Sequence, residues 1–421
     1  MLKYIYTDRK TGVNQLRRGH ILGLLVIAVI LAFLGTTLFS PPLPAGLGPE
    51  VLPPGIPDNE PRVLSATLAA VGDIMGHLTQ VEQARTTAAD GSVVYDFRPS
   101  FDFIAPALLD ADITVGNLET TLAGSARGYS GFPTFNTPEE LAANLKEAGF
   151  DLLATANNHS MDMGMSGLKT TVENVRAAGL LNFGTYLTPE DRDTPLIVDV
   201  NGIQIAFTAY TKSTNGIPVP RDHGYAVKYI ENFQDPSPMF EEIAAARRAG
   251  ADLVAVYMHW GFEYSFDPAD YQRDLAQRLA DAGADLILGS HPHVIQPLEW
   301  ITVREGERAG KRALVAYSLG NFVSNQFHWP PYIPTPAVQY GLLLQVELEK
   351  NLNSGETVIS DAGYQITWVH RDWRHRILPV QEVLKRGPEE YNLNSAQMEE
   401  LEEGLAWMKG IVETFRFSEL K

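Results

Sequence analysis

The chain contains no cysteine among its 421 residues. Disulfides, thiolate metal ligands and thiol catalysis are therefore excluded. A domain of this size can bury a large hydrophobic core and does not need covalent cross-links to fold, even outside the cytoplasm. Any metal site in this protein has to be built from nitrogen and oxygen ligands.

Basic residues are scarce relative to acidic ones. The chain has 33 lysines and arginines against 51 aspartates and glutamates, a formal net charge of −18. Nucleic acid is not an expected partner, because binding through phosphates needs a basic surface. A free polyanion is also repelled, so an acidic ligand would have to be held locally, by metal or by a few basic groups. No Gly-x-Ser-x-Gly, Walker-type or dinucleotide-binding signature supports a competing enzyme class.

Long hydrophobic runs are absent except at residues 21–39, which contain no charged side chain. A helix of that length spans roughly 28 Å, about the thickness of a bilayer core. Residues 1–20 carry five lysines and arginines and one aspartate, which predicts a cytoplasmic tail and an extracytoplasmic remainder. A cleaved signal peptide is the alternative, but the run exceeds a usual signal core and no clear Ala-x-Ala site follows. We therefore expect a single-pass membrane anchor, followed at 40–62 by a linker with eight prolines.

From residue 63 onward, short hydrophobic runs alternate with helical stretches. Four helices are predicted, at 138–148, 166–178, 237–249 and 268–282. Strands are predicted after them, at 151–155, 182–183, 252–257 and 285–288. Later runs predict a second, antiparallel sheet, at 203–210, 312–317, 340–349 and 364–369. The expected fold is an α/β two-sheet sandwich flanked by helices over residues 63–380, with a helical C-terminal extension at 381–421.

Five hydrophobic runs end on side chains that can bind a metal. The segments are Val71-Gly72-Asp73, Gly116-Asn117-Leu118-Glu119, Asn157-Asn158-His159, Met258-His259-Trp260-Gly261 and Gly289-Ser290-His291-Pro292-His293. Strands that stop at such residues present them at one edge of a sheet, where α/β folds place their sites. Asp, Glu, Asn and His are typical ligands of hydrolytic metal centres. We expect these segments to converge on one centre.

Two of these segments carry the most specific signals. His291 and His293 follow a strand and are stiffened by the proline between them, so they can fill adjacent coordination positions or serve neighbouring metals. Two exposed loop histidines are the simpler alternative. The Asn158 amide can bind a cation, while His159, oriented by Asp162, acts as an acid or an electrostatic stabiliser. An Asn-His pair after a strand can equally be a helix cap.

The remaining candidates are weaker when each is taken alone. Asp73 and Glu119 could be solvated turn residues, and His259 could be a satisfied core histidine. Glu263, four residues after His259, could be its partner or a substrate contact. A metal site is favoured because several such residues occur together at the ends of predicted strands. Other histidines lie in less regular surroundings and are interpreted as surface or supporting residues: His77, His223, His328, His370 and His375.

Taken in order, these segments closely resemble the CapA/PgsA family of bacterial capsule-synthesis proteins, which are associated with poly-γ-glutamate. The similarity covers about residues 64–323. It rests on Gly72-Asp73-Ile74-Met75, Gly116-Asn117-Leu118-Glu119, Asn157-Asn158-His159-Ser160-Met161-Asp162, His259-Trp260-Gly261-x-Glu263-Tyr264, His291-Pro292-His293-Val294-x-Gln296-Pro297 and Tyr317-Ser318-Leu319-Gly320-Asn321-Phe322. The family is similar to calcineurin-type metallophosphoesterases, which implies that fold, and an N-terminal anchor with an external domain also fits it.

The similarity to metallophosphoesterases implies a role for each residue. Asp73 and His293 match ligands of a first metal, and Glu119 takes the place of the aspartate that bridges the two metals. His159 matches the histidine that handles the leaving group. Ligands of the second metal are matched by Asn158, His259 and His291. The chain departs from the pattern at Met75, where those enzymes carry a further histidine, and at Glu119, which is longer than aspartate.

The implied cofactor is one or two divalent ions, with Mn²⁺, Zn²⁺ or Fe²⁺ favoured over Ca²⁺ because three ligands are imidazole. The implied function is an extracytoplasmic, membrane-anchored component of synthesis or export of poly-γ-glutamate or a related anionic polymer, working with membrane-bound synthase subunits. If the site is catalytic, metal-assisted hydrolysis or transfer at a phosphorus or carbonyl centre is expected. The alternatives are a non-catalytic scaffold that binds the polymer through metal and a surface metallophosphoesterase unrelated to capsule.

Overall fold

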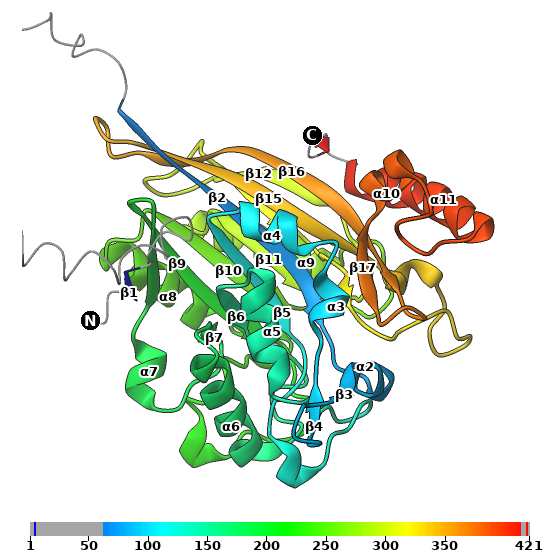
Figure 1. Ribbon diagram of the computed structural model, residues 1–421. Helices are drawn as coiled ribbons and strands as arrows, with labels where there is room; N and C mark the ends of the chain where they lie inside the picture. The colour runs from blue at the N-terminus through cyan, green and yellow to red at the C-terminus, as the bar shows by residue number, and fades with distance from the viewer. Residues whose placement is uncertain (1–3, 6–61, 414–417, 420–421) are drawn as a thin grey trace, which may run out of the picture.

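The computed structural model describes residues 4–5, 62–413 and 418–419. Within them, no helix combines the length and the hydropathy that a membrane span requires. The predicted anchor at 21–39 lies outside the described residues, as does the predicted linker at 40–62 apart from its last residue. From Val63 the chain folds into two stacked β-sheets with helices on their outer faces (Figure 1).

The first sheet has nine strands: β2 (Val63–Ile74), β5 (Ile113–Leu118), β6 (Leu152–Ala154), β7 (Leu181–Phe183), β14 (Asn321–Val323), β15 (Tyr340–Asn351), β16 (Thr357–His370), β17 (Arg376–Pro379) and β18 (Ser418–Glu419). Their order is β17-β16-β15-β2-β5-β6-β7, with β14 beside β2 and β18 beside β16. β2, β5, β6, β7 and β14 pair in parallel. β15, β16 and β17 are antiparallel to their neighbours along that order.

The second sheet has seven strands: β1 (Tyr4–Ile5), β8 (Leu196–Val200), β9 (Ile203–Thr211), β10 (Leu253–His259), β11 (Leu286–Ser290), β12 (Leu298–Thr302) and β13 (Arg312–Ala316). Their order is β1-β8-β9-β10-β11-β13-β12. The central strands β9, β10, β11 and β13 are parallel, while β8 and β12 pair antiparallel with β9 and β13. A separate hairpin is formed by β3 (Arg85–Thr87) and β4 (Val93–Tyr95).

Helices cover the outer face of each sheet. On the seven-stranded sheet these are α8 (Ser237–Arg248) and α9 (Asp270–Ala282). On the nine-stranded sheet they are α3 (Arg98–Phe101), α4 (Ala105–Asp110), α5 (Glu140–Ala148) and α6 (Gly164–Ala177). The other α-helices among the described residues are α2 (Leu78–Ala84), α7 (Pro189–Asp193), α10 (Val380–Arg386) and α11 (Ser395–Val412). Short 3₁₀ turns occur at Ser125–Arg127, Arg221–His223, Glu231–Phe233 and Pro336–Gln339.

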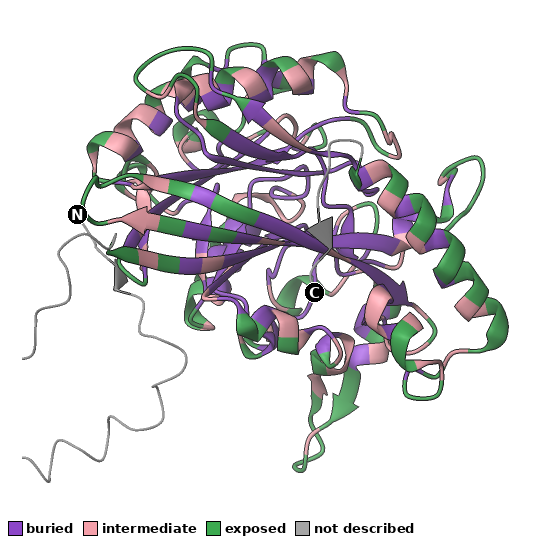
Figure 2. Ribbon diagram, turned by 90° about the horizontal axis from the view of Figure 1, so that it is seen from above, coloured by how far each residue is buried: buried purple, intermediate pink, exposed green. Residues whose placement is uncertain are grey.

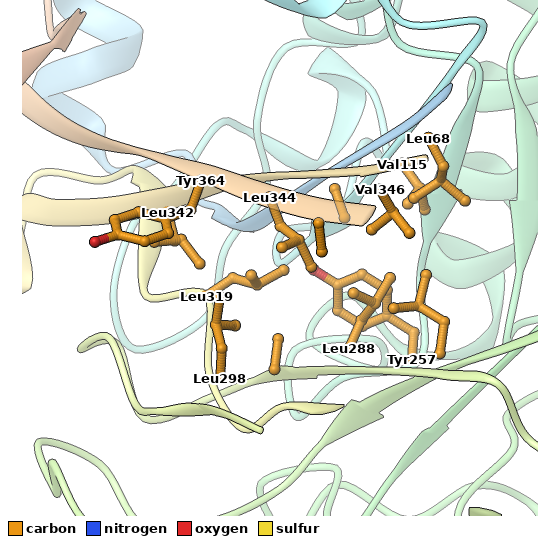
Figure 3. Close-up of a cluster of buried hydrophobic side chains, with 14 of the residues drawn as sticks. Leu68, Val115, Tyr257, Leu288, Leu298, Leu319, Leu342, Leu344, Val346 and Tyr364 are labelled. Carbon is orange, nitrogen blue, oxygen red and sulfur yellow. The ribbon is translucent and has the colours of Figure 1, made fainter. Parts of the chain in front are cut away.

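The main hydrophobic core lies between the two sheets. Leu68 and Val115 of the nine-stranded sheet face Tyr257 and Leu288 of the seven-stranded sheet, and all four are buried (Figure 3). Each such side chain contributes about 1.5–3 kcal/mol of burial energy. The strands are therefore buried along most of their length, whereas the helices are exposed on one side (Figure 2). Helix α11 of the C-terminal extension completes the same core with Leu401, Met408 and Val412.

The α/β sandwich with flanking helices is confirmed, and all four predicted helices end within two residues of their predicted limits. The prediction that the later runs form a separate antiparallel sheet is wrong. β9 and β13 pair in parallel with β10 and β11 in the seven-stranded sheet, whereas β15 and β16 pair antiparallel beside β2 in the nine-stranded sheet. For β9 the reason is that α8 crosses from the end of β9 back to the start of β10, and such a crossover places successive strands in parallel.

Candidate metal centre

The carboxyl ends of parallel strands from both sheets meet at one end of the sandwich. Strands β2, β5 and β6 of the nine-stranded sheet lead into Asp73, Glu119 and Asn158. Strands β10 and β11 of the seven-stranded sheet lead into His259, His291 and His293. All six side chains are buried. The site therefore lies between two sheets, which corrects the expectation of a site at the edge of one: one sheet supplies oxygen ligands and the other supplies imidazoles.

Three of the six residues form what we call the imidazole group: Glu119, His259 and His291. One ligand atom from each lies within 4.8 Å of the others. Glu119 Oε1 is 3.6 Å from His259 Nε2. The amide oxygen of Asn158 lies beside this group, 3.0 Å from the same His259 nitrogen. The spacing is suited to a cation held by two imidazoles, a carboxylate and an amide oxygen.

A second set, the carboxylate group, consists of Asp73, Glu119 and His293, again with ligand atoms within 4.8 Å of one another. His293 Nδ1 is 3.1 Å from Asp73 Oδ2, and its Nε2 is 3.8 Å from Glu119 Oε1. Glu119 thus belongs to both groups. A carboxylate shared by two neighbouring ligand sets is the arrangement that a two-metal centre needs.

Two orphaned polar atoms show that these residues fit a divalent cation. Across residues 62–413, Glu119 Oε1 and His291 Nδ1 are buried and make no hydrogen bond. Leaving a buried polar atom unpaired costs about 1–3 kcal/mol, and more for a charged group. A cation between them would satisfy both atoms, so the residues present fit a bound divalent ion.

The pKa shifts of the buried ligands are also consistent with a bound cation. Burial, followed by repulsion from Asp73, raises the pKa of Glu119 well above its usual value. Burial, followed by the neighbouring histidines and Lys212, lowers the pKa of His259 and His291 well below the usual range. Two buried neutral imidazoles are in the form that binds metal.

His293 differs from the other two histidines. Burial acts to lower its pKa, but the hydrogen bond and the charge of Asp73 outweigh burial and raise the pKa above its usual value. Its Nδ1 also lies 3.1 Å from Asn321 Oδ1. The carboxylate group therefore contains a hydrogen-bonded pair of its own, whereas His291 Nδ1 of the imidazole group makes no hydrogen bond within residues 62–413.

The loop that carries the two histidines has an unusual backbone. His291 has a φ of 94° and His293 a φ of 57°, in a left-handed region that side-chain-bearing residues rarely adopt. The rings of His259 and His291 are 4.8 Å apart, while His293 contacts Asp73. This conformation lets one short loop supply an imidazole to each group.

Three polar side chains that the sequence did not single out hold the ligands in place. Asn117 Nδ2 donates to Asp73 Oδ1 (2.8 Å) and to Glu119 Oε2 (3.2 Å). Ser290 Oγ is 2.9 Å from His259 Nδ1, which leaves the Nε2 of that ring facing the centre. Asn321 positions His293 in the same way. Each of the three residues lies inside one of the sequence motifs named above, and that position was the sequence feature that could have identified it.

Residues 317–320 connect the two sheets at the centre, between β13 and β14. The Leu319 N–H donates to the Gly289 carbonyl (3.0 Å), and the Gly320 carbonyl accepts from the Asp73 N–H (2.9 Å). A Cβ at Gly289 would overlap the backbone of this segment. The sixth motif is therefore a backbone link that fixes the distance between the two halves of the site.

His159 and Asp162 lie beside the centre, and neither belongs to a ligand group. His159 Nδ1 is 2.7 Å from Asp162 Oδ2, and the same oxygen accepts from the Phe135 N–H (2.6 Å). The Phe135 ring meets the imidazole edge-on, with centroids 4.6 Å apart. The imidazole is held through Nδ1, so Nε2 is the nitrogen available to a bound substrate.

A cleft of about 650 Å³ opens beside the centre, and His159, His293 and Glu263 are among its lining residues. Glu263 is exposed and lies in neither ligand group. Met75 also lines the cleft, in the position where the phosphoesterase pattern has a histidine. His77, interpreted from the sequence as a surface or supporting residue, lines the cleft as well and lies in neither group.

A family model described as bacterial capsule synthesis protein PGA_cap matches residues 67–326, which include every residue of both ligand groups. The chain belongs to this family. It is 31% identical to the capsule biosynthesis protein CapA of Bacillus anthracis over 284 residues, 66% of this chain and 64% of that one. It is 33% identical to the PGA biosynthesis protein CapA of Bacillus subtilis over 288 residues, 66% and 68% of the two chains. The predicted family is thus confirmed.

More distant similarity extends to two further proteins. A probable polyglutamine synthesis accessory protein of Mycobacterium tuberculosis is 26% identical over 196 residues, 45% of this chain and 51% of that one. The crystal structure of a phosphatase from Mycoplasma pneumoniae aligns with a TM-score of 0.41 and 13% identity, over 72% of this chain and 94% of that one. The chain spans about two thirds of the length of the two Bacillus relatives.

Proposed function

We propose that this protein is a membrane-anchored, extracytoplasmic component of capsule-polymer synthesis or export, with a two-metal centre of hydrolase type. The polymer in this proposal is poly-γ-glutamate or a related anionic chain. The observation that carries the proposal is the pair of buried ligand groups that share Glu119, inside a chain of a capsule synthesis family. The uncharged run at 21–39 behind a basic tail supports the anchor.

The residues divide the chemical work between them. Asp73, Glu119, Asn158 and the three histidines would hold two divalent ions, which supply Lewis-acid chemistry for hydrolysis or transfer at a phosphorus or carbonyl centre. His159, held through Nδ1 by Asp162, delivers a proton from Nε2 to the leaving group. Burial of the ligands keeps bulk water away from the reacting centre, which strengthens every charge interaction within it.

The metal-dependent role is tested by replacing His291 with alanine in a strain that lacks the native gene. The expected result is loss of divalent metal from the purified protein and loss of surface polymer. His223→Ala is the matched control, because His223 belongs to neither ligand group. If polymer output survives while metal is lost, the centre is not used in polymer formation, and a binding scaffold replaces the hydrolase in this proposal.

The membrane topology is tested separately. Protease added to intact protoplasts should remove the folded domain and leave a short anchored fragment. Full protection of the domain would contradict the extracytoplasmic assignment, whatever the outcome of the metal experiment.

A further inference from the structure

The cleft beside the metal centre is lined by both buried and exposed side chains. His159 and His293 are buried, whereas Glu263 is exposed. Large aromatic side chains with high exposure also line it: Phe132 (78%), Trp329 (57%) and Tyr332 (70%). Exposed aromatic side chains gathered at a concave site mark a binding surface more often than they mark stability.

The aromatic residues form a wall with a defined geometry. Phe327 and Trp329 stack with ring centroids 6.3 Å apart and planes 10° apart, and Tyr332 lies 5.3 Å from Trp329. Backbone hydrogen bonds of 2.9 Å in both directions between Trp329 and Ile333 close the loop on itself. The rings are therefore presented by a loop with its own internal bonds.

The base of this wall is attached to the body of the domain. Asn325, just after β14, accepts from Arg371 Nε (3.2 Å), and its Oδ1 lies 2.9 Å from His375 Nε2. The Arg371 guanidinium lies against the Phe327 ring, 4.1 Å from its centroid. Because β14 pairs with the end of β2 at Asp73, the wall is anchored on the strand that supports the metal centre. The wall and the centre therefore hold a fixed relation to each other.

The charges of the cleft argue against a polyanionic occupant. Among the described residues that line it, there is no lysine or arginine, and the carboxylate is Glu263. Arg371 is engaged by Asn325 and the Phe327 ring, and Lys212 donates to the Gly261 carbonyl. Apart from the ions of the proposed metal centre, a chain of carboxylates along this wall would meet no compensating charge.

We propose that the cleft binds an uncharged ring with a flat apolar face, a sugar ring or an aryl ring, carried by the substrate on which the metal centre acts. Such a face packs on the Trp329 and Tyr332 rings, while Gln326, whose Oε1 accepts from Asn321, offers its amide N–H groups to the cleft. The inference rests on the proposed function for the identity of the site. It adds that substrate selection occurs through ring packing and not through attraction of a polyanion.

The test measures binding by titration calorimetry on the full-length protein after removal of metal with a chelator, so that no turnover occurs. The probes are a panel of neutral methyl glycosides, a panel of uncharged phenols and a γ-linked glutamate pentamer. At least one ring panel should bind, and Trp329→Ala or Tyr332→Ala should weaken that binding about three- to tenfold, the usual contribution of one aromatic pair. The panel that binds identifies whether the ring is a sugar or an aryl group.

Three further variants separate loss of ring binding from misfolding and from loss of metal. Trp407 is exposed to a similar degree (42%) on α11 and does not line the cleft, so Trp407→Ala should bind the ring as wild type does. Trp329→Phe keeps an aromatic face and should retain most of the affinity. Absence of ring binding, binding of the glutamate pentamer alone, or equal weakening in Trp407→Ala would each overturn the inference. His291→Ala should bind the ring normally, so failure of the proposed metal function is seen separately.

Discussion

The imidazole group and the carboxylate group share Glu119 but differ in what surrounds them. In the imidazole group, His291 Nδ1 has no hydrogen-bond partner in the part of the chain that the structure describes, and burial lowers the pKa values of His259 and His291. In the carboxylate group, His293 is already paired with Asp73 and its pKa is raised. The imidazole group therefore contains a buried nitrogen that a cation would satisfy, whereas in the carboxylate group His293 is already hydrogen-bonded to Asp73.

This difference indicates that the two positions will not bind metal equally. An ion entering the carboxylate group has to displace the contact between Asp73 and His293, and Met75 offers no additional imidazole there. An ion entering the imidazole group displaces the neutral contact between His259 Nε2 and the Asn158 amide oxygen (3.0 Å), and both atoms can then bind the ion. We expect the imidazole group to hold its ion more tightly, and the following substitutions test that comparison.

The largest effect is expected from Glu119→Gln, because the residue belongs to both groups. The amide lacks the charge that two cations would share, and removing a buried charged partner costs about 3–5 kcal/mol, more than about 100-fold in affinity. Elemental analysis should find neither ion bound. Retention of one full equivalent would show that Glu119 does not join the two groups.

A smaller, selective effect is expected from the two histidines that are separated by one proline. His291→Ala should remove the tightly held ion, whereas His293→Ala should remove the weaker one and leave about half of the metal of a fully loaded protein. Stoichiometry measured across a titration with Mn²⁺ or Zn²⁺ distinguishes the two variants. Identical curves for both would mean that the groups do not differ in the way described above.

His159→Ala should leave the metal content unchanged and reduce function. His159 lies outside both groups, and loss of a general acid lowers a rate by about 10²–10⁴-fold. Metal content and polymer output are measured on the same variant, with Asp162→Asn as a companion that keeps the imidazole but weakens its orientation. Metal loss equal to that of His291→Ala would make His159 a ligand.

The smallest effect on metal binding is expected from substitution of His375, a buried histidine outside both ligand groups, which should change only the pH dependence of stability. Burial, followed by the charges of Arg371 and His77, lowers the pKa of His375 to about 3. His375 therefore stays neutral in the folded chain and takes up a proton on unfolding below about pH 6.5. Stability is full above pH 6.5 and declines as the pH falls towards 3, by up to about 2 kcal/mol at pH 5.

In His375→Gln that part of the pH dependence should disappear, while metal content stays at the wild-type level. Urea unfolding of chelator-treated protein at several pH values between 7.5 and 5 measures the difference between the two proteins. Parallel pH profiles for wild type and variant would refute the assignment of a neutral, buried His375.

Much of the site could be read from local sequence because strand ends carry recognisable signals. A hydrophobic run that stops at Gly-Asp, Asn-His or Ser-His-Pro-His places a polar side chain where a buried strand emerges, and this follows from chain geometry alone. Asp73 and His291 were found in this way, and the structure brings them into adjoining ligand groups. Asn117 and Ser290 were not singled out, because an amide or hydroxyl next to a ligand points inward or outward only once its strand has neighbours.

By itself, the sequence determined that the chain is an α/β protein without disulfides, with parallel strands, helices of nearly the observed length and a set of nitrogen and oxygen ligands at strand ends. Those properties depend on side-chain periodicity, glycine caps and residue chemistry, which are local. The sequence also predicted two sheets. Only the tertiary structure decided which strands join each sheet, that both sheets are mixed, that oxygens and imidazoles come from opposite sheets, and that an aromatic wall lies beside them. These features depend on which distant segments pack together. The crossover through α8, the backbone link at residues 317–320 and the core between the sheets bring those segments into contact. The sequence of a short segment does not specify its distant neighbours.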